Sequence, residues 1–419
     1  MEKMVINGAK KLSGIVSVHG SKNSTLPIIA ASILCDAEIV LHNCPNLTDI
    51  DAAVNILRFL GCKIKREKDM LIINSENINT SEIPHKLMHE MRSSIVFLGA
   101  LLAKTGKAKI SAPGGCEIGL RPIDLHLKAM RELGAEIEEE NGNLCCFVND
   151  CLKGREITLA FPSVGATENI IIASTMAEGR TTLVNAAREP EIKNLADFLN
   201  MCGAKIHFAG ESTVIIDGVK KLHGAEFYII SDRIVAATYM AAAAITGGEM
   251  EIINFPVRDI VPVLPVFYST GCEILSDETR LKIKAPKKLN TVGTVRTMPF
   301  PGFPTDFQAP AMAMASVSSG TSIFIETIFE SRYKHVPELK RMGANISIEG
   351  PVAVVQGIKK LKPANVYAED LRGGIALVLA GLSAEGTSCV YNLNHIDRGY
   401  EDIEGVFRSL GADIKREVN

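Results

Sequence analysis

An internal repeat constrains the fold of this chain more than any other feature of its sequence. A short segment of the form Gly-(Ala/Cys)-x-Ile closes an amphipathic stretch six times, at intervals of 73, 69, 68, 72 and 68 residues. Chance spacing would not hold within five residues over five intervals, so one unit of about 70 residues is repeated six times. The six copies of the short Gly-(Ala/Cys)-x-Ile segment begin at Gly61, Gly134, Gly203, Gly271, Gly343 and Gly411.

Each repeat has the same order of expected elements. An apolar helix of small residues, such as residues 92–104 or 371–384, leads to a turn and then to an alternating strand such as residues 249–253. A second helix of period 3.6, such as residues 125–133, ends on the repeated glycine, which suits a left-handed cap, and a hairpin follows. The turn is expected at Gly106, Gly179, Gly248, Gly320 and Gly386, with Asp36 in the first repeat.

The two ends of the chain complement each other. The last hairpin is short, because the sequence ends eight residues after Gly411. Residues 5–12 resemble residues 216–222 and 355–361, which belong to hairpins of other repeats. We therefore expect the first ~20 residues to pair beside the last repeat.

Composition excludes several classes of protein. Among 419 residues, 45 basic and 48 acidic side chains give a net charge of −3, which argues against a nucleic-acid-binding protein. The longest apolar run, residues 234–245, is shorter than the about 20 residues that span a bilayer, and the N-terminus has no signal-peptide core. We expect a cytoplasmic protein without a membrane segment.

One cysteine differs from the other nine. The ten cysteines contain no Cys-x-x-Cys pair, so nine are expected to be small buried hydrophobes rather than metal ligands or disulfides. The second repeat runs 28 residues from Gly106 to Gly134, whereas the later four run 23 to 25. Its extra residues form a Gly-rich loop around Cys116, and Arg121 follows nearby, a setting that favours a reactive thiolate.

Charged residues also recur where helices are expected to begin. Basic groups at a helix N-terminus suit anions, although each segment alone also reads as a helix cap or a solvated charge. No P-loop and no dinucleotide-binding fingerprint is present, so ATP and NAD lack support. The segments are residues 21–24, 91–94, 304–308, 370–373 and 396–400.

These residues carry a resemblance to a known family. The run from Pro113 to His126 resembles the active loop of the UDP-N-acetylglucosamine 1-carboxyvinyltransferases, which belong to the enolpyruvyl transferases. The similarity extends from end to end and in order. Supporting motifs lie at residues 20–23, 163–169, 301–308, 335–339 and 395–400.

The resemblance implies a fold and a reaction. The fold is α/β, with two similar inside-out α/β barrel domains of three repeats each. One domain is expected at residues 21–229, with the cysteine loop at about residues 111–122; the other combines residues 1–20 with residues 230–419. The implied reaction transfers the enolpyruvyl group of phosphoenolpyruvate to the 3′-hydroxyl of UDP-N-acetylglucosamine and releases phosphate, without a metal or organic cofactor. It is the first committed step of peptidoglycan synthesis.

The resemblance also assigns roles to residues of this chain. Cys116 matches the general acid, which also forms a covalent adduct with phosphoenolpyruvate. This match predicts that the epoxide fosfomycin labels Cys116. Asp306 matches the residue at the sugar 3′-hydroxyl, a candidate base. The residues that match the cations around the phosphate and carboxylate of phosphoenolpyruvate are Lys22, Arg92, Arg121 and Arg398. Asp370 and Arg372 are expected to complete this set of charged residues. The remaining substrate-binding positions are Asn23, Pro122, Ile123, Asp124, Leu125, His126, Ser163, Val164, Gly165 and Ile328.

Some positions depart from the family pattern, and two alternatives stay open. Val235 stands where Glu is expected, Ser331 where Asn is expected, and Gly373-Gly374 is less bulky than usual, a change that could loosen packing. One alternative is a catalytically weak or regulatory paralogue that binds UDP-sugar. The other is 5-enolpyruvylshikimate-3-phosphate synthase, which shares the fold and the donor; the cysteine loop and residues 163–167 argue against it.

Overall fold

A computed structural model describes residues 2–111 and 123–418 of the chain. The described residues divide into two compact units, each with its own apolar core. We call residues 20–111 and 123–230 the N lobe, and residues 2–19 and 231–418 the C lobe.

Three apolar helices lie at the centre of the N lobe and contact one another. They are α1 (Lys22–Ala31), α4 (Phe97–Thr105) and α6 (Val164–Ser174), and most of their side chains are buried because most of the residues are small or apolar on every face. Amphipathic helices with a polar outer side accompany them: α2 (Thr48–Phe59), α5 (Asp124–Glu132) and α7 (Pro190–Met201). Short segments α3 (His85–Glu90), η1 (Ser32–Leu34) and η2 (Arg92–Val96) complete the helical elements.

Three four-stranded sheets surround the helices of the N lobe. The first, in the order β14-β3-β5-β4, contains Glu226–Tyr228, Glu38–His42, Met70–Asn74 and Lys63–Glu67. The second, β6-β7-β9-β8, contains Glu82–Ile83, Lys107–Ser111, Asn143–Phe147 and Glu136–Glu140. The third, β10-β11-β13-β12, contains Glu156–Thr158, Arg180–Val184, Thr213–Asp217 and Lys205–Phe208.

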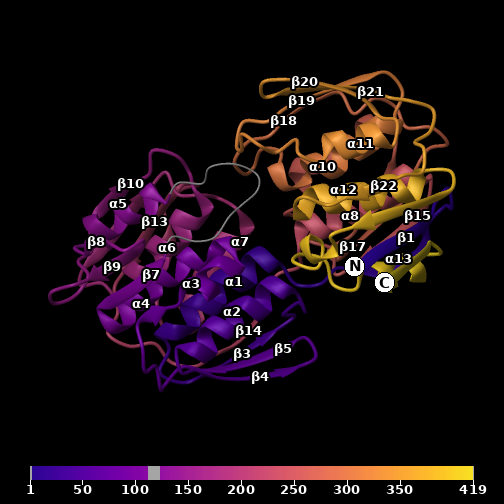
Figure 1. The fold of residues 1–419 in the computed structure, drawn as a ribbon. Coiled ribbons are helices and arrows are strands. Elements are labelled where there is room, and N and C mark those ends of the chain that lie inside the picture. The colour runs from indigo at the N-terminus through magenta and orange to yellow at the C-terminus, as the bar shows by residue number, and fades with distance from the viewer. Residues whose placement is uncertain (1, 112–122, 419) are drawn as a thin grey trace. The chain divides into compact units, whose positions relative to one another are not determined.

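The C lobe repeats this plan. Its central helices are α8 (Arg233–Thr246), α10 (Gln308–Val317) and α12 (Leu371–Ser383), which contact one another inside the sheets (Figure 1). Its other helical elements are η3 (Val261–Val263), α9 (Leu264–Ser269), η4 (Thr305–Phe307), α11 (Val336–Arg341), η5 (Leu393–His395) and α13 (Ile403–Ser409).

The C lobe also contains three sheets, each of four strands. The first, β16-β17-β15-β2, contains Glu273–Ser276, Arg280–Lys284, Glu249–Ile253 and Ser13–Ser17. The second, β18-β19-β21-β20, contains Thr294–Arg296, Thr321–Ile325, Val352–Gln356 and Asn345–Glu349. The third, β22-β23-β1-β24, contains Asn365–Tyr367, Thr387–Tyr391, Glu2–Asn7 and Asp413–Val418. The predicted fold class, an α/β chain built from six repeats with helices inside, is therefore confirmed.

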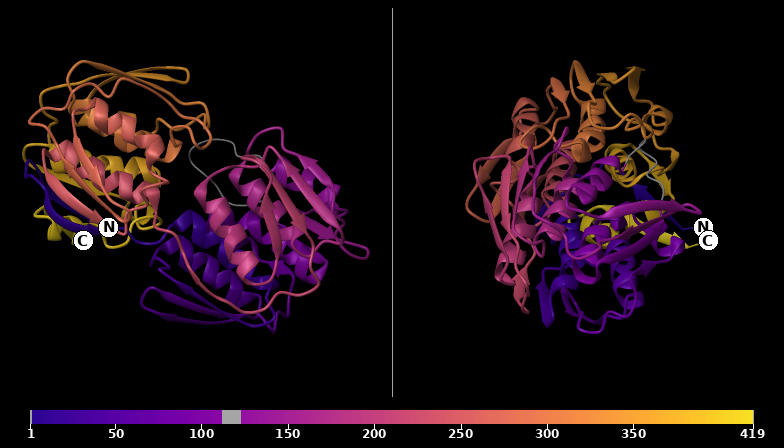
Figure 2. Two further views of the ribbon diagram at one scale, coloured as in Figure 1. Left: turned by 180° about the vertical axis from the view of Figure 1, so that it is seen from behind. Right: turned by 90° about the vertical axis from the view of Figure 1, so that its left-hand side faces the viewer.

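The N-terminal strands complete two sheets of the C lobe. β1 lies between β23 and β24 and runs antiparallel to both, with Glu2 opposite Val418. The N and C labels accordingly lie side by side in both views of Figure 2. β2 then pairs in parallel with β15. β1 thus takes the place of a hairpin strand in the sheet of the last repeat, which explains why residues 5–12 resemble the hairpin strands of other repeats.

The repeated glycines adopt the expected left-handed conformation. All six that end the amphipathic helices have φ between 85° and 101°, where a side chain would be strained. The turn glycines at positions 106, 179, 320 and 386 also have positive φ. In the turn of the fourth repeat the prediction was wrong by one residue: Gly247 is left-handed at φ 67°, while Gly248 is not.

A second repeated device was not predicted from the sequence. Asparagine follows β3, β11, β15 and β23, with φ between 53° and 61° in each case. Each side chain bonds the end of the neighbouring parallel strand, as when Asn43 donates to the carbonyl of Ile229 at 2.9 Å and Asn185 to that of Leu159 at 2.8 Å. Asparagine tolerates the left-handed region and carries a donor, so it ties two strands together where the chain turns. The other two asparagines with this conformation and bonding are Asn254 and Asn392.

The cysteines fit the prediction only in part. Nine are described and none of these forms a disulfide. Six are buried, but Cys145, Cys151 and Cys389 are half-buried, so the expectation of nine buried cysteines was wrong for these three. None of the helices in the described part of the chain has the length and hydropathy needed to cross a bilayer.

Candidate active site

In the N lobe, Lys22 opens the apolar helix α1. Ser21 caps this helix through its side chain, which accepts a bond from the amide of Ser24 at 3.3 Å. The Lys22 side chain is 11% exposed, and its Nζ lies 3.1 Å from Oδ2 of Asp49 in α2. A carboxylate that holds a buried ammonium offsets part of its desolvation and fixes its position. Asn23 is the next residue of α1 and is half-buried.

Two predicted binding segments of the N lobe meet at His126. Ile123 is the N-cap position of α5, Asp124 and Leu125 are its first two residues, and His126 is buried on its inner side. Ser163 caps α6, and a Cβ added to Gly165 would lie 3.2 Å from Cε1 of His126. Glycine therefore allows the imidazole to approach the first turn of α6. Val164, which lies between Ser163 and Gly165 in the sequence, is half-buried.

The pKa of His126 is lowered to about 4, first because burial penalises the imidazolium form and then because of the nearby Arg92. Asp124 opposes this shift but does not reverse it. His126 is thus neutral at physiological pH. Arg92 begins η2 and is half-buried.

In the C lobe, Asp306 is held by two arginines. Its Oδ1 accepts from Nη2 of Arg332 at 2.8 Å, and its Oδ2 accepts from Nη2 of Arg372 at 2.9 Å. The guanidinium side chains are each 3% exposed, whereas the Asp306 side chain is 28% exposed. Arg332 is fixed further by two bonds to the carbonyl of Thr305. Two buried guanidinium groups thus hold one partly exposed carboxylate from either side, and Asp232 also attracts Arg372.

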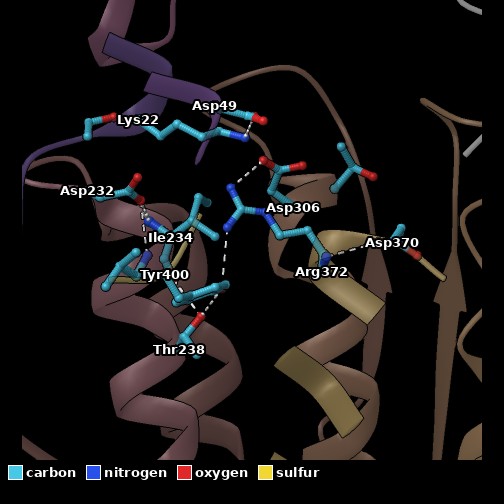
Figure 3. A network of polar contacts seen from close by, with 12 residues as sticks. Lys22, Asp49, Asp232, Ile234, Thr238, Asp306, Asp370, Arg372 and Tyr400 are labelled. Carbon is cyan, nitrogen blue, oxygen red and sulfur yellow. Dashed lines mark hydrogen bonds and ion pairs between the residues drawn. The ribbon is translucent and has the colours of Figure 1, made fainter. Parts of the chain in front are cut away.

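Arg372 begins an ordered chain of hydrogen bonds (Figure 3). Its Nη1 donates to the Tyr400 hydroxyl at 3.3 Å, which lies 2.9 Å from the Thr238 hydroxyl. Thr238 donates its single proton to the carbonyl of Ile234 at 2.8 Å, so Tyr400 is the donor toward Thr238. Burial is the largest single influence and lowers the pKa of Arg372, but Asp306, Tyr400 and Asp232 together outweigh it, so the net pKa is raised. Arg372 is a permanent cation of fixed orientation.

Asp370 acts on helix α12 rather than on a neighbouring cation. Its Oδ1 accepts from the amides of Arg372 and Gly373, both at 2.9 Å, which makes it the N-cap of that helix. A Cβ on Gly373 would lie 2.8 Å from Oδ2 of Asp370 and 2.9 Å from Cβ of His335. Gly374 is equally confined, because a Cβ would lie 2.8 Å from Cγ1 of Ile396. The two glycines are closely packed, contrary to the expected loosening.

The other predicted residues of the C lobe lie on loops. The amide of Ile328 donates to Oε1 of Glu326 at 2.9 Å, which fixes the turn after β19. Arg398 follows η5 and is half-buried. Of the departures from the family pattern, Val235 is buried in α8, where its amide is capped by Asp232.

Three predicted residues, Cys116, Arg121 and Pro122, lie outside the described residues. Several residues that the structure adds were not predicted. Nothing in the local sequence around them signals a partner: Arg332 and Asp306 are 26 positions apart, and Arg372 and Asp306 are 66 apart. The added residues are Asp49, Arg332, Tyr400, Thr238 and Asn169.

Comparison with known proteins identifies the family. The family model described as EPSP synthase (3-phosphoshikimate 1-carboxyvinyltransferase) matches residues 6–407. The UDP-N-acetylglucosamine 1-carboxyvinyltransferase 2 of Caldanaerobacter subterraneus subsp. tengcongensis is 50% identical over 416 residues, covering 99% of this chain and 100% of that protein. The chain belongs to the enolpyruvyl transferase family.

Further enolpyruvyl transferases agree with this assignment. The UDP-N-acetylglucosamine 1-carboxyvinyltransferase of Finegoldia magna is 47% identical and covers 99% of each chain. The crystal structure of the enolpyruvyl transferase NikO from Streptomyces tendae has a TM-score of 0.91 at 23% identity, covering 100% of this chain and 99% of NikO. EPSP synthase from Acinetobacter baumannii has a TM-score of 0.77 at 17% identity, with complete coverage of both chains. These two structures support the fold.

Proposed function

We propose that this protein transfers the enolpyruvyl group of phosphoenolpyruvate to the 3′-hydroxyl of UDP-N-acetylglucosamine and releases phosphate. The observation that carries the proposal is Asp306, a partly exposed carboxylate held between Arg332 and Arg372. Relatives that are 44–50% identical over 99% of the chain and are named for this reaction support the choice of acceptor.

The reaction needs a base for the acceptor hydroxyl. Each oxygen of Asp306 accepts one bond from an arginine, and a carboxylate oxygen can accept more than one. Asp306 can therefore take the proton of the sugar hydroxyl while the arginines hold its position. The fixed geometry reduces the reorganisation that the transfer requires.

The donor needs an acid and several cations. As the acceptor oxygen bonds to C2 of phosphoenolpyruvate, C3 takes a proton, for which Cys116 is the proposed acid and also the site of a covalent adduct. Loss of a proton from C3 then expels phosphate and restores the double bond. We assign the phosphate and carboxylate of the donor to Lys22, Arg92, Arg121, Arg372 and Arg398, because preorganised cations stabilise this charge.

The nucleotide sugar is assigned to three parts of the chain. Residues 121–126, residues 163–165 and Ile328 would hold it, with Asn23 beside the reacting groups. Within the N lobe, the contact between His126 and Gly165 supports this assignment, because it joins two of these segments. Asp370 would act indirectly, by capping the helix that carries Arg372.

The wider setting of the enzyme follows from this reaction. We infer two domains with boundaries near residues 20 and 230, small-molecule substrates only, and a role in peptidoglycan synthesis in the cytoplasm. Such an enzyme would serve cell-wall growth and hence cell shape and division, and fosfomycin would inactivate it at Cys116.

Phosphate release from phosphoenolpyruvate tests the proposal against its rivals. We expect release with UDP-N-acetylglucosamine and none with shikimate 3-phosphate. Turnover with shikimate 3-phosphate alone would identify an EPSP synthase, the enzyme named by the family model. Binding of UDP-N-acetylglucosamine without any turnover would identify a regulatory paralogue.

A further inference from the structure

The strongest unassigned arrangement in the N lobe surrounds the side chain of Asn169, which is fully buried in α6. Its Oδ1 accepts from the amide of Gly99 at 2.7 Å. Its Nδ2 lies 3.1 Å from the carbonyl of Ile95 and 3.0 Å from Nδ1 of His126. The consecutive elements η2 and α4 and the more distant α5 thus meet on one amide group from α6.

These contacts decide which way the amide points. A backbone N–H can only donate, so the atom facing Gly99 must be the carbonyl oxygen of Asn169. The other amide atom is then the NH2 group, which also suits the carbonyl of Ile95. Both partners require the same orientation, although oxygen and nitrogen of an amide look alike.

The amide orientation in turn decides the state of His126. The NH2 group of Asn169 can only donate, so Nδ1 of His126 must accept and carries no proton. In a neutral imidazole the proton then sits on Nε2. The lowered pKa of His126, which burial and Arg92 cause, agrees with a neutral ring.

The protonated edge of the ring faces the first turn of α6. A Cβ on Gly165 would lie 3.2 Å from Cε1 and 3.4 Å from Nε2 of His126. An N–H donor that carries no charge is therefore held beside the first turn of a helix of 11 residues.

We propose that Asn169 is a positioning residue that locks His126 as the neutral Nε2–H tautomer, which donates to an acceptor oxygen of the bound nucleotide. This inference rests on the proposed function, because the ligand is taken to be the uridine nucleotide. A histidine ring whose tautomer and orientation are already fixed loses no free energy to rotation or proton exchange when the nucleotide binds. The hydrogen bond that its Nε2–H then donates strengthens nucleotide binding by about tenfold.

Nitrogen-15 NMR of the histidine side chains in the full chain tests the lock without any ligand. We expect His126, assigned by comparison with His126→Gln, to show a bare Nδ1 and a protonated Nε2 at pH 7. In Asn169→Asp the facing atom becomes an acceptor, so the proton should move to Nδ1 or the ring should become charged. Asn200→Asp, in an asparagine whose side chain bonds only the backbone of Ile206 among the described residues, should leave the His126 signals unchanged. A wild-type His126 with its proton on Nδ1 would overturn the inference even where the Asn169 variant does not fold.

Calorimetry with UDP as the probe tests the consequence for binding. We expect Asn169→Asp and His126→Phe to weaken UDP about tenfold and Asn200→Asp to leave it unchanged. Wild-type UDP binding that both variants retain would refute the role of the tautomer in binding while leaving the proposed function intact. Failure of the wild type to bind UDP would contradict the proposed function and this ligand, and the NMR result would still report on the lock.

Discussion

Arg372 donates from Nη2 to Oδ2 of Asp306 at 2.9 Å, although 66 positions separate the two residues. The contact joins the first turn of the buried helix α12 to η4, the short turn that precedes α10. A rigid, charged helix start thereby fixes the carboxylate to which we assign the proton transfer.

Replacing that carboxylate separates catalysis from binding. Asp306→Asn keeps the shape of the side chain but removes the base, so turnover should fall by at least about 100-fold. The affinity for UDP-N-acetylglucosamine, measured by calorimetry, should change much less. Asp277→Asn, in an exposed turn where the carboxylate bonds only Thr279 and Arg280 among the described contacts, is the matched control. Equal losses of turnover and affinity in Asp306→Asn would make this residue a binding group only.

The tyrosine behind Arg372 should matter for stability. Tyr400→Phe leaves the buried Nη1 of Arg372 without its acceptor, so the free energy of unfolding should fall by about 1–3 kcal/mol. Thr238→Val removes the acceptor of the Tyr400 hydroxyl and the donor to the Ile234 carbonyl, and it should cost less because both of these groups are neutral whereas Arg372 is charged. Denaturant titrations of both variants make the comparison. A larger loss in Thr238→Val would show that the bonds do not run in the order assigned here.

The reactive thiol is tested by mass spectrometry. The wild type should gain one fosfomycin adduct, and Cys116→Ser should gain none, because only a thiolate opens the epoxide readily. Cys151→Ser, which removes a half-buried cysteine, should label like the wild type. An adduct that persists in Cys116→Ser would move the reactive thiol elsewhere.

Glu168 should make stability depend on pH. Burial raises the pKa of this carboxyl in the folded protein, and Glu191 and Glu189 raise it further. Above the ordinary value of 4.5 the unfolded chain has lost this proton while the folded protein keeps it, so the free energy of unfolding falls as pH rises.

The variant Glu168→Gln removes this penalty. It should be more stable than the wild type at pH 7.5, and the difference should vanish near about pH 4, where both states are protonated. Thermal unfolding at both pH values measures it, with the exposed Glu138→Gln as the control. A variant that is less stable than the wild type at pH 7.5 would mean that the Glu168 carboxylate is ionised and paired in the fold.

Local rules made much of the fold predictable. The repeated glycines had to accept positive φ, and residues 249–253 form the expected strand without any shift of its ends. The helix predicted at residues 92–104 instead begins as η2 and becomes α4 only at Phe97. Element type follows from side-chain pattern, whereas a boundary depends on contacts that the pattern does not contain.

The site was predictable only where one position carried the signal. Lys22 and Arg372 could be singled out because each is a charged residue in the first turn of an apolar helix. The partners of these residues could not, since Asp49 and Arg332 are ordinary charged residues until the fold brings them into contact. Asn169 lies within an apolar helix, and its role appears only once Gly99 and His126 are beside it.

The most direct test of the central claim is the structure of the product formed from phosphoenolpyruvate and UDP-N-acetylglucosamine. Proton and phosphorus NMR of the reaction mixture should show one enol ether on the sugar 3′-oxygen for each phosphate released. Phosphate released without that enol ether, or an enol ether formed on shikimate 3-phosphate instead, would contradict the account.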